Sequence, residues 1–270
     1  MTNAELRKLQ ETELGILIDF DAFCKKHNLT YYLIGGALLG AVRYQKFIPW
    51  DDDIDVAMPR EDYESLKRIY ESSEKYFLQN SDTDPCFSRC IQKIRLHNTK
   101  AVERLSEGVP MHHGIYMDIF PIDYLENDQK WKLKFRACFI RFYLSLRPIM
   151  AGYTGVRYRR LKKAIRCLCP LRTAFIDQRL DRLCTKENSK TRKYAILWLH
   201  NYSWEHQLHG VDVFGEGSTC TFEGHPFSAP ADIQAFLQRV FGENYLTEPP
   251  VEKRRNSHNF VYVEYENCQS

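Results

Sequence analysis

Hydrophobic residues recur along residues 2–28 with the spacing of an amphipathic helix, with leucine and isoleucine on one face and charged residues on the other. An aromatic and β-branched run over 31–34 predicts a strand that ends at the pair Gly35-Gly36. Good helix formers with apolar positions one turn apart predict a second helix over 37–44. The chain therefore begins as a helix, a strand, a glycine turn and another helix.

Alternating polar and apolar positions predict further strands, and a hairpin is predicted between residues 212–215 and 220–225. Helices are predicted to begin at Pro59 and at Pro230, because proline suits the first turn of a helix. This mixture indicates an α/β (α+β) fold, with a mixed β-sheet flanked by helices.

Four aspartates follow one another closely after the second helix. In an extended chain Asp51, Asp53 and Asp55 would share one face, while Asp52 and Ile54 would share the other. Carboxylates on one face repel one another unless a cation lies among them, and hard oxygen ligands suit Mg²⁺ or Mn²⁺. The glycine turn upstream opens a helix, whose free N–H groups favour phosphate. Together they predict a nucleotidyltransferase site, with a solvated acidic loop as the alternative.

Two later strands carry further charged candidates. Lys93 and Arg95 share a face of the strand predicted over 87–97, where they would meet phosphates unless this is a solvated edge strand. Asp118 lies within an alternating apolar strand, and a carboxylate buried there needs a partner such as a metal. Asp123 fits a turn or a cap instead.

Two sequence runs carry a resemblance to a known family: GGALLGAVR at 35–43 and IPWDDDID at 48–55. They resemble the LicD family, bacterial phosphocholine transferases related to fukutin and fukutin-related protein. The resemblance continues at 114–123, 222–225 and 241–254, and it is weakest between about residues 130 and 200.

The resemblance implies a nucleotidyltransferase-like fold and a Mg²⁺-dependent phosphotransferase. The implied reaction moves phosphocholine from CDP-choline to a hydroxyl of a cell-surface glycan precursor, such as a teichoic acid or lipopolysaccharide sugar. Three alternatives stay open: transfer of ribitol or glycerol phosphate from its CDP donor, nucleotide transfer from an NTP, and a non-enzymatic membrane-surface adaptor.

Each candidate residue has an implied role. Asp53, Asp55 and Asp118 would hold the metal and act in catalysis, with Asp51 as a further ligand candidate. The residues expected to bind the nucleotide phosphates are Gly35, Gly36, Arg43 and Lys93. Two residues of the C-terminal segment join the candidates, Arg254 and His258. Choline favours an aromatic cage, for which the candidates are Trp50, Tyr116, Trp198, Tyr202 and Trp204.

Charge is distributed unevenly along the chain. Residues 130–193 contain 19 Lys and Arg against three acids, although the whole chain carries a net charge of only +3. We predict a basic helical insert there, between a catalytic core over 1–129 and a completing part over 194–270. Aromatic residues interleaved with the charges suggest contact with an anionic membrane. A helical cap with a solvated or acceptor-binding face is the alternative, and no nucleic-acid partner is expected.

Nine cysteines without disulfide-like spacing indicate free thiols in a reducing compartment. The sequence shows neither a signal peptide nor an apolar run of the roughly 20 residues that span a bilayer. We therefore expect a cytoplasmic protein, peripheral at the inner face of the membrane if the insert binds lipid.

Overall fold

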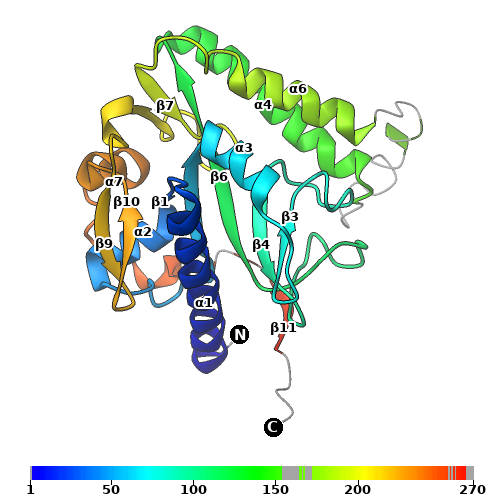
Figure 1. Ribbon diagram of the computed structural model, residues 1–270, viewed down its shortest axis with the longest axis vertical. Helices are drawn as coiled ribbons and strands as arrows, with labels where there is room; N and C mark the ends of the chain where they lie inside the picture. The colour runs from blue at the N-terminus through cyan, green and yellow to red at the C-terminus, as the bar shows by residue number, and fades with distance from the viewer. Residues whose placement is uncertain are drawn as a thin grey trace.

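A mixed β-sheet forms the centre of the protein (Figure 1). The computed structural model describes residues 2–153, 164–165, 167, 172–254, 256, 258 and 260–265. The sheet has the order β1-β2-β6-β4-β3 and is extended from β6 by β7 and then β8. Its strands are β1 (Tyr32–Leu33), β2 (Asp55–Pro59), β3 (Tyr76–Gln79), β4 (Gln92–Leu96), β6 (Tyr116–Leu125), β7 (Tyr194–Ile196) and β8 (Leu208–Gly210). Strands β2 and β6 run parallel, whereas the other neighbours are antiparallel, so the predicted mixed sheet is confirmed.

Strand β6 is the axis of this sheet and is buried along all ten of its residues. Its first part pairs with β2 and β4, and its last three residues pair with β7. Asp123 therefore lies inside a strand, and its assignment to a turn or cap is wrong. Arg60 donates two hydrogen bonds to its carboxylate, of 2.8 and 2.7 Å, which neutralise the buried charge.

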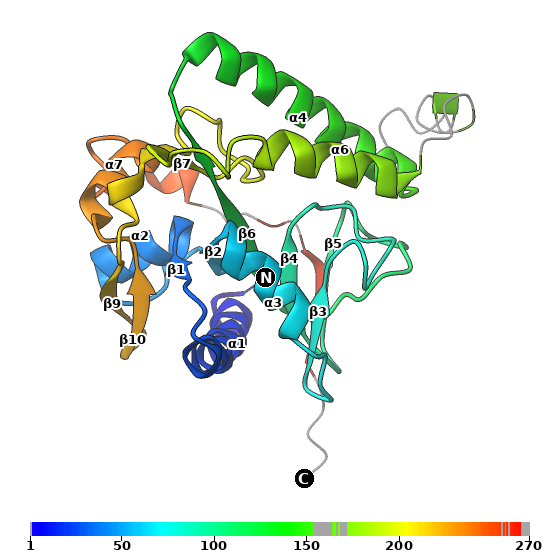
Figure 2. The same cartoon turned by 45° about the horizontal axis from the view of Figure 1, so that its top comes forward.

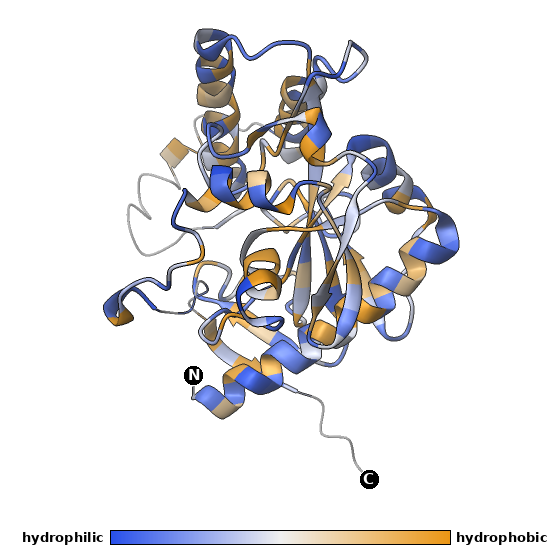
Figure 3. Ribbon diagram, turned by 90° about the vertical axis from the view of Figure 1, so that its left-hand side faces the viewer, coloured by the Kyte–Doolittle hydropathy of each residue, from blue (hydrophilic) through white to orange (hydrophobic). Residues whose placement is uncertain are grey.

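Four helices surround the sheet: α1 (Asn3–His27), α2 (Gly35–Tyr44), α3 (Arg60–Ile69) and α7 (Ile233–Phe241). Helix α1 packs against β6 and β4, and α3 packs against β2 and β6. A capping box between Thr2 and Glu5 begins α1, and Asn28 in the left-handed conformation ends it. Figure 3 shows hydrophilic and hydrophobic residues alternating along the helices, with hydrophobic residues concentrated in the sheet.

Two small sheets complete the core. The predicted hairpin exists with a different partner, because β9 (Ser218–Phe222) pairs with β10 (His225–Ala229) and not with 212–215, which holds the 3₁₀ turn η1 (Val211–Val213). Glu223 and Gly224, both at positive φ, form the tight two-residue turn that sets this register. The other small sheet pairs β5 (Lys100–Glu103) with β11 (Phe260–Glu264).

Helices α4 (Lys130–Met150) and α6 (Thr173–Thr185) lie side by side away from the other helices (Figure 2). They pack around a separate hydrophobic cluster that includes Leu133, Ile140 and Leu180. Part of the predicted insert, residues 154–163, 166 and 168–171, lies outside the described residues.

Two expectations concern the whole chain. Within the described residues, no helix combines the length and the apolar character needed to cross a membrane. The seven described cysteines are all free thiols, as the spacing predicted.

Candidate active site

Strand register places three charged residues in one row across the sheet. Asp55 on β2 lies directly opposite Asp118 on β6, and Asp118 lies directly opposite Lys93 on β4. Residues opposite one another in neighbouring strands point to the same face, so the row is a single charged surface. Strand β4 lies between β6 and β3, and Lys93 is almost fully buried, so the reading of a solvated edge strand is wrong.

The other aspartates lie in the loop before β2, because the strand begins only at Asp55. Gln10 of α1 holds this loop by donating hydrogen bonds to the backbone carbonyls of Asp51, at 2.9 Å, and Ile48, at 3.4 Å. The Ile54 carbonyl accepts the backbone N–H of Asp118 at 3.0 Å. The strand that carries the aspartates is thus shorter than predicted. Contacts with α1 and β6 nevertheless hold the loop that precedes it.

Three of the predicted carboxylates gather at this point. Burial, with the charges of Asp52 and Asp55, raises the pKa of Asp51 to about 7. Burial, with the charges of Asp55 and Asp51, also raises the pKa of Asp53 well above its usual range. The folded chain therefore makes these groups unfavourable as anions unless a cation joins them.

The glycine turn lies against the same carboxylates. A Cβ on Gly36 would lie 2.1 Å from an Asp51 oxygen, and one on Gly35, at φ +59°, would lie 3.1 Å from an Asp55 oxygen. Only glycine admits this approach, which sets the positive end of α2 beside the acids. Phosphate binding by Gly35 and Gly36 stays a prediction, since carboxylates already face this helix end.

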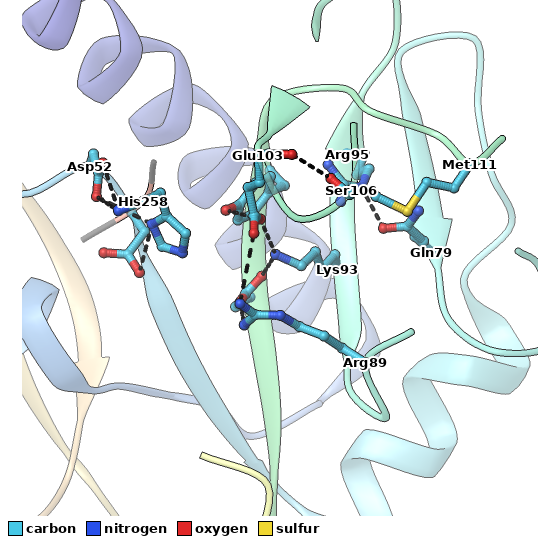
Figure 4. Close-up of polar contacts among 12 residues, drawn as sticks. Asp52, Gln79, Arg89, Lys93, Arg95, Glu103, Ser106, Met111 and His258 are labelled. Atoms are coloured by element: carbon cyan, nitrogen blue, oxygen red, sulfur yellow. Dashed lines mark hydrogen bonds and ion pairs between the residues drawn. The ribbon is translucent and has the colours of Figure 1, made fainter. Parts of the chain in front are cut away.

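A buried carboxylate and the C-terminal segment complete the acidic side of the site. Both Asp52 oxygens accept the backbone N–H of His258, at 3.2 and 3.1 Å, and the His258 ring nitrogen Nδ1 lies 3.2 Å from Asp52 and 3.8 Å from Asp53 (Figure 4). Ligand atoms of Asp52, Asp53 and His258 lie within 4.8 Å of one another. Glu13 of α1 is also buried here, and its Oε2 has no hydrogen-bond partner among the described residues.

Cations from two segments meet Asp118. The Lys93 Nζ lies 2.6 Å from one Asp118 oxygen, an ion pair without hydrogen-bond geometry, and Arg89 lies 3.4 Å from the other (Figure 4). Glu103 lies 3.9 Å from both cations and accepts a hydrogen bond of 2.8 Å from Tyr116. Burial lowers the pKa of Lys93 to about 8, although Asp118 opposes this shift. Burial would raise the pKa of Glu103, but the charges of Lys93 and Arg89 outweigh it and lower the pKa to about 2.

A cleft of about 500 Å³ opens beside these cations. Its polar wall includes Arg89 and Lys93, and its other walls come from α4 and from the loop after β7. In that loop, His200 lies 3.6 Å from Asp55 and stacks on Tyr202. Burial, with the charges of Asp55 and Asp51, raises the pKa of Tyr202 to about 12, which places its ring close to the acids.

Three candidates lie at the edge of this arrangement. The Arg43 guanidinium, at the far end of α2 from the glycine turn, donates to the backbone carbonyls of Tyr245 and Thr247. Arg254 lies over the ring of Trp50, which directly precedes the aspartates. The structure thus uses Arg43 to hold the C-terminal segment, and it does not bring this side chain to the carboxylates.

A divalent cation fits this set of donors. The carboxylates of Asp51, Asp53 and Asp55 lie close together and supply only hard oxygen ligands, and the neighbouring charges help to raise the pKa of Asp51 and of Asp53. Asp118 is the less available ligand, because Lys93 and Arg89 already engage both of its oxygens.

Comparison with known proteins agrees with this geometry. Residues 28–136 match the family described as LicD/FKTN/FKRP, nucleotidyltransferase domain. The matched segment runs from the end of α1 into α4. The chain is also 28% identical over 263 residues, 96% of its length and 97% of the relative's, to the lipopolysaccharide cholinephosphotransferase LicD of Haemophilus influenzae. An uncharacterised protein of Rickettsia typhi is 28% identical over 122 residues, which are 44% of this chain and 37% of that protein.

The matched segment contains the charged row and the four aspartates, while other contributors lie outside it. His200, Tyr202 and His258 come from the part of the chain after residue 136. Sequence reasoning missed four site residues: Glu13, Arg89, Glu103 and His200. Arg89 and Glu103 carry no motif of their own, and only strand pairing brings them to Asp118 and Lys93. For Glu13 one sequence signal was available: it is a charged residue on the otherwise apolar face of the first helix.

Proposed function

We propose that this chain transfers phosphocholine from CDP-choline to a hydroxyl of a cell-surface glycan precursor, a lipopolysaccharide or teichoic acid sugar, with Mg²⁺ or Mn²⁺. The observation that carries the proposal is the convergence of Asp51, Asp53 and Asp55 beside the Asp118–Lys93 pair at the wall of a cleft. Likeness to the Haemophilus cholinephosphotransferase along nearly its whole length supports the choice of phosphocholine and of a glycan acceptor.

The acidic loop would supply the cofactor site. Asp53 and Asp55 would hold the divalent cation, with Asp51 and Asp118 next to them. When bound, such an ion neutralises the charge that develops on the leaving CMP. Gln10 and Glu13 belong to the helix that holds this loop in place.

The basic side of the site would bind and orient the reactants. Arg89 lines the cleft next to Asp118 and is partly exposed, so we assign it to the donor phosphates, the role that the sequence predicted for Arg43. Lys93 holds the Asp118 carboxylate in place at 2.6 Å. We assign to Asp118 the role of general base. It accepts the proton of the acceptor hydroxyl as the new O–P bond forms and the bond between phosphorus and CMP breaks.

The candidates for the choline cage differ in whether a cation of the protein already lies over the ring. The rings of Tyr116, Trp198 and Trp50 already carry Lys93, Arg136 and Arg254, at 3.3, 4.9 and 5.1 Å from the ring centres. Within the described residues, Tyr202 and Trp204 line the cleft without such a cation. We therefore assign these two rings to the trimethylammonium group.

The deciding experiment is calorimetric binding of CDP-choline, CDP-ribitol, CDP-glycerol and CTP to the full chain, with and without Mg²⁺. Selective, Mg²⁺-dependent binding of CDP-choline is expected, and Asp53→Asn with Asp55→Asn should abolish it. The matched control is Asp128→Asn with Asp212→Asn, which removes two charges from exposed positions and should bind as the wild type does. The substitution Trp204→Leu should weaken CDP-choline more than CDP-glycerol.

Each other outcome points to a different function. Preference for another CDP-alcohol would change our assignment of the transferred group and would leave the proposed site and metal unchanged. Tighter CTP binding with pyrophosphate release would indicate nucleotide transfer. Absence of any nucleotide binding would refute the enzyme proposal and leave the membrane-surface adaptor.

A further inference from the structure

Helix α4 has two faces that differ sharply. Leu133, Ala137 and Ile140 are buried against the cluster shared with α6. On the opposite side an aromatic stripe faces outward, consisting of Trp131, Phe135, Phe139 and Phe142. These four side chains are between 44% and 71% exposed, and their spacing of four, four and three residues puts them on one line of the helix.

The aromatic stripe is not the usual scatter of single apolar residues on a protein surface. Phe135 and Phe139 are in edge contact, with ring centres 4.9 Å apart, so these two exposed rings form one apolar patch. Monomeric proteins rarely leave contiguous apolar surface uncovered unless it meets a partner or a membrane.

The charges that helix α4 itself places beside the aromatic stripe are of one sign. Lys134 and Arg141, seven residues apart, follow one side of it, and Lys132 follows the other; all three are exposed. Helix α4 contains no Asp or Glu. On the neighbouring helix, Phe175 is exposed and Arg179 lies over its ring at 4.9 Å.

We propose that the aromatic stripe and its flanking cations dock this protein onto an anionic lipid surface. Aromatic side chains would enter the boundary between head groups and acyl chains, while Lys132 and Lys134 extend along the apolar surface to reach lipid phosphates. A second copy of the chain fits poorly, because two such faces would bring six like charges together around one apolar patch.

The aromatic stripe lies next to the cleft of the candidate active site. Arg141 flanks the aromatic stripe and also lines the cleft, together with Ile140 and Leu144 of the same helix. Docking through the stripe would hold the cleft mouth at the lipid surface. Lipid binding itself needs no catalysis, so the inference stands or falls separately from the proposed reaction.

The test is cosedimentation of the full chain with vesicles of phosphatidylcholine alone and of phosphatidylcholine with phosphatidylglycerol. Wild type should bind the anionic vesicles. Its affinity should fall at least tenfold when the salt concentration is raised, and at least tenfold when phosphatidylglycerol is omitted. Replacing all four stripe residues by serine should weaken binding at least tenfold, and Lys132→Gln with Lys134→Gln should remove most of the preference for anionic lipid. The control Leu246→Ser with Val251→Ser, which removes exposed apolar groups elsewhere, should bind as the wild type does.

Three outcomes would overturn the proposal. In the first, wild-type protein stays in the supernatant with both kinds of vesicle; in the second, the serine variant binds as tightly as wild type. In the third, sedimentation equilibrium would reveal a dimer that the serine substitutions dissociate, and a second copy would then be the occupant. Thermal unfolding of the serine variant checks that a loss of binding is not a loss of fold.

Discussion

The sheet site and the α4–α6 pair both bury a cation beside a carboxylate, but they use it differently. Lys93 lies 2.6 Å from Asp118, and Arg147 lies 2.7 Å from Asp177. Each cation is almost completely buried. Around Lys93, further acids and a second cation converge at the wall of a cleft, whereas the contact between Arg147 and Asp177 ties α4 to α6.

This difference teaches that a buried ion pair does not by itself mark a functional site. What distinguishes the sheet site is an excess of acid that its own cations do not neutralise, with the pKa of Asp51 raised to about 7. In the α4–α6 pair the excess is positive and faces outward. The two regions therefore differ in the sign of the charge that remains uncompensated.

The largest expected effect is on the acidic cluster. Asp53→Asn with Asp55→Asn should reduce phosphocholine transfer at least 1,000-fold, roughly 4 kcal/mol of barrier. The same change should stabilise the metal-free protein by about 1 kcal/mol, because it removes repulsion between buried carboxylates. CMP release and thermal unfolding in EDTA measure the two effects. Loss of both activity and stability would instead mean that these aspartates hold the fold together.

The next prediction compares the two buried pairs directly. Lys93→Met and Arg147→Met should each cost about 3–5 kcal/mol of unfolding free energy, because each removes the buried cation nearest to a carboxylate. Only Lys93→Met should abolish CDP-choline binding, measured at low temperature where both variants remain folded. A folded Arg147→Met protein that no longer binds the donor would contradict the claim that only the pair in the sheet site is needed for donor binding.

A pH experiment sharpens the account of the sheet site. Burial opposes ionisation of Glu103, yet Lys93 and Arg89 lower its pKa to about 2, below the value near 4.3 of an unfolded chain. Its stabilisation, about 3 kcal/mol, is thus present above pH 4.3 and is lost as pH falls toward 2. The stability difference between wild type and Glu103→Gln, from urea unfolding, should shrink between pH 6 and pH 3. The exposed control Glu243→Gln should show no such change, and a difference for Glu103→Gln that stays constant with pH would contradict the prediction.

The smallest effect is expected on the exposed face of α4. Phe135→Ser should change the unfolding free energy by no more than about 0.5 kcal/mol, because the ring is 65% exposed. Ile140→Ala, on the buried face of the same helix, should cost about 2–5 kcal/mol. Urea unfolding of both variants measures the contrast. A large cost for Phe135→Ser would place the aromatic stripe in the core and remove the basis for docking.

Individual residues separate what the sequence predicted from what it did not. Hydrophobic periodicity located α1 within one residue at each end, because an amphipathic helix records its buried face in its own spacing. Asp123 was misassigned to a turn or a cap, because its place within β6 is shown only by the pairing of that strand with β7. The C-terminal hairpin was shifted because the positive φ of Glu223 is not apparent from its residue type.

The sequence by itself determined the α/β class, the order of elements, the aspartate cluster beside a glycine turn, and the basic aromatic character of the first helix of the predicted insert. Each of these is written in neighbouring residues, whose periodicity and charge are visible without a partner. Only the tertiary structure decided that Arg89 and Glu103 join Lys93 and Asp118, that His200 faces Asp55, and that Arg43 turns away. Such contacts depend on strand order and register, through which residues far apart in the chain meet at distances that local spacing does not encode.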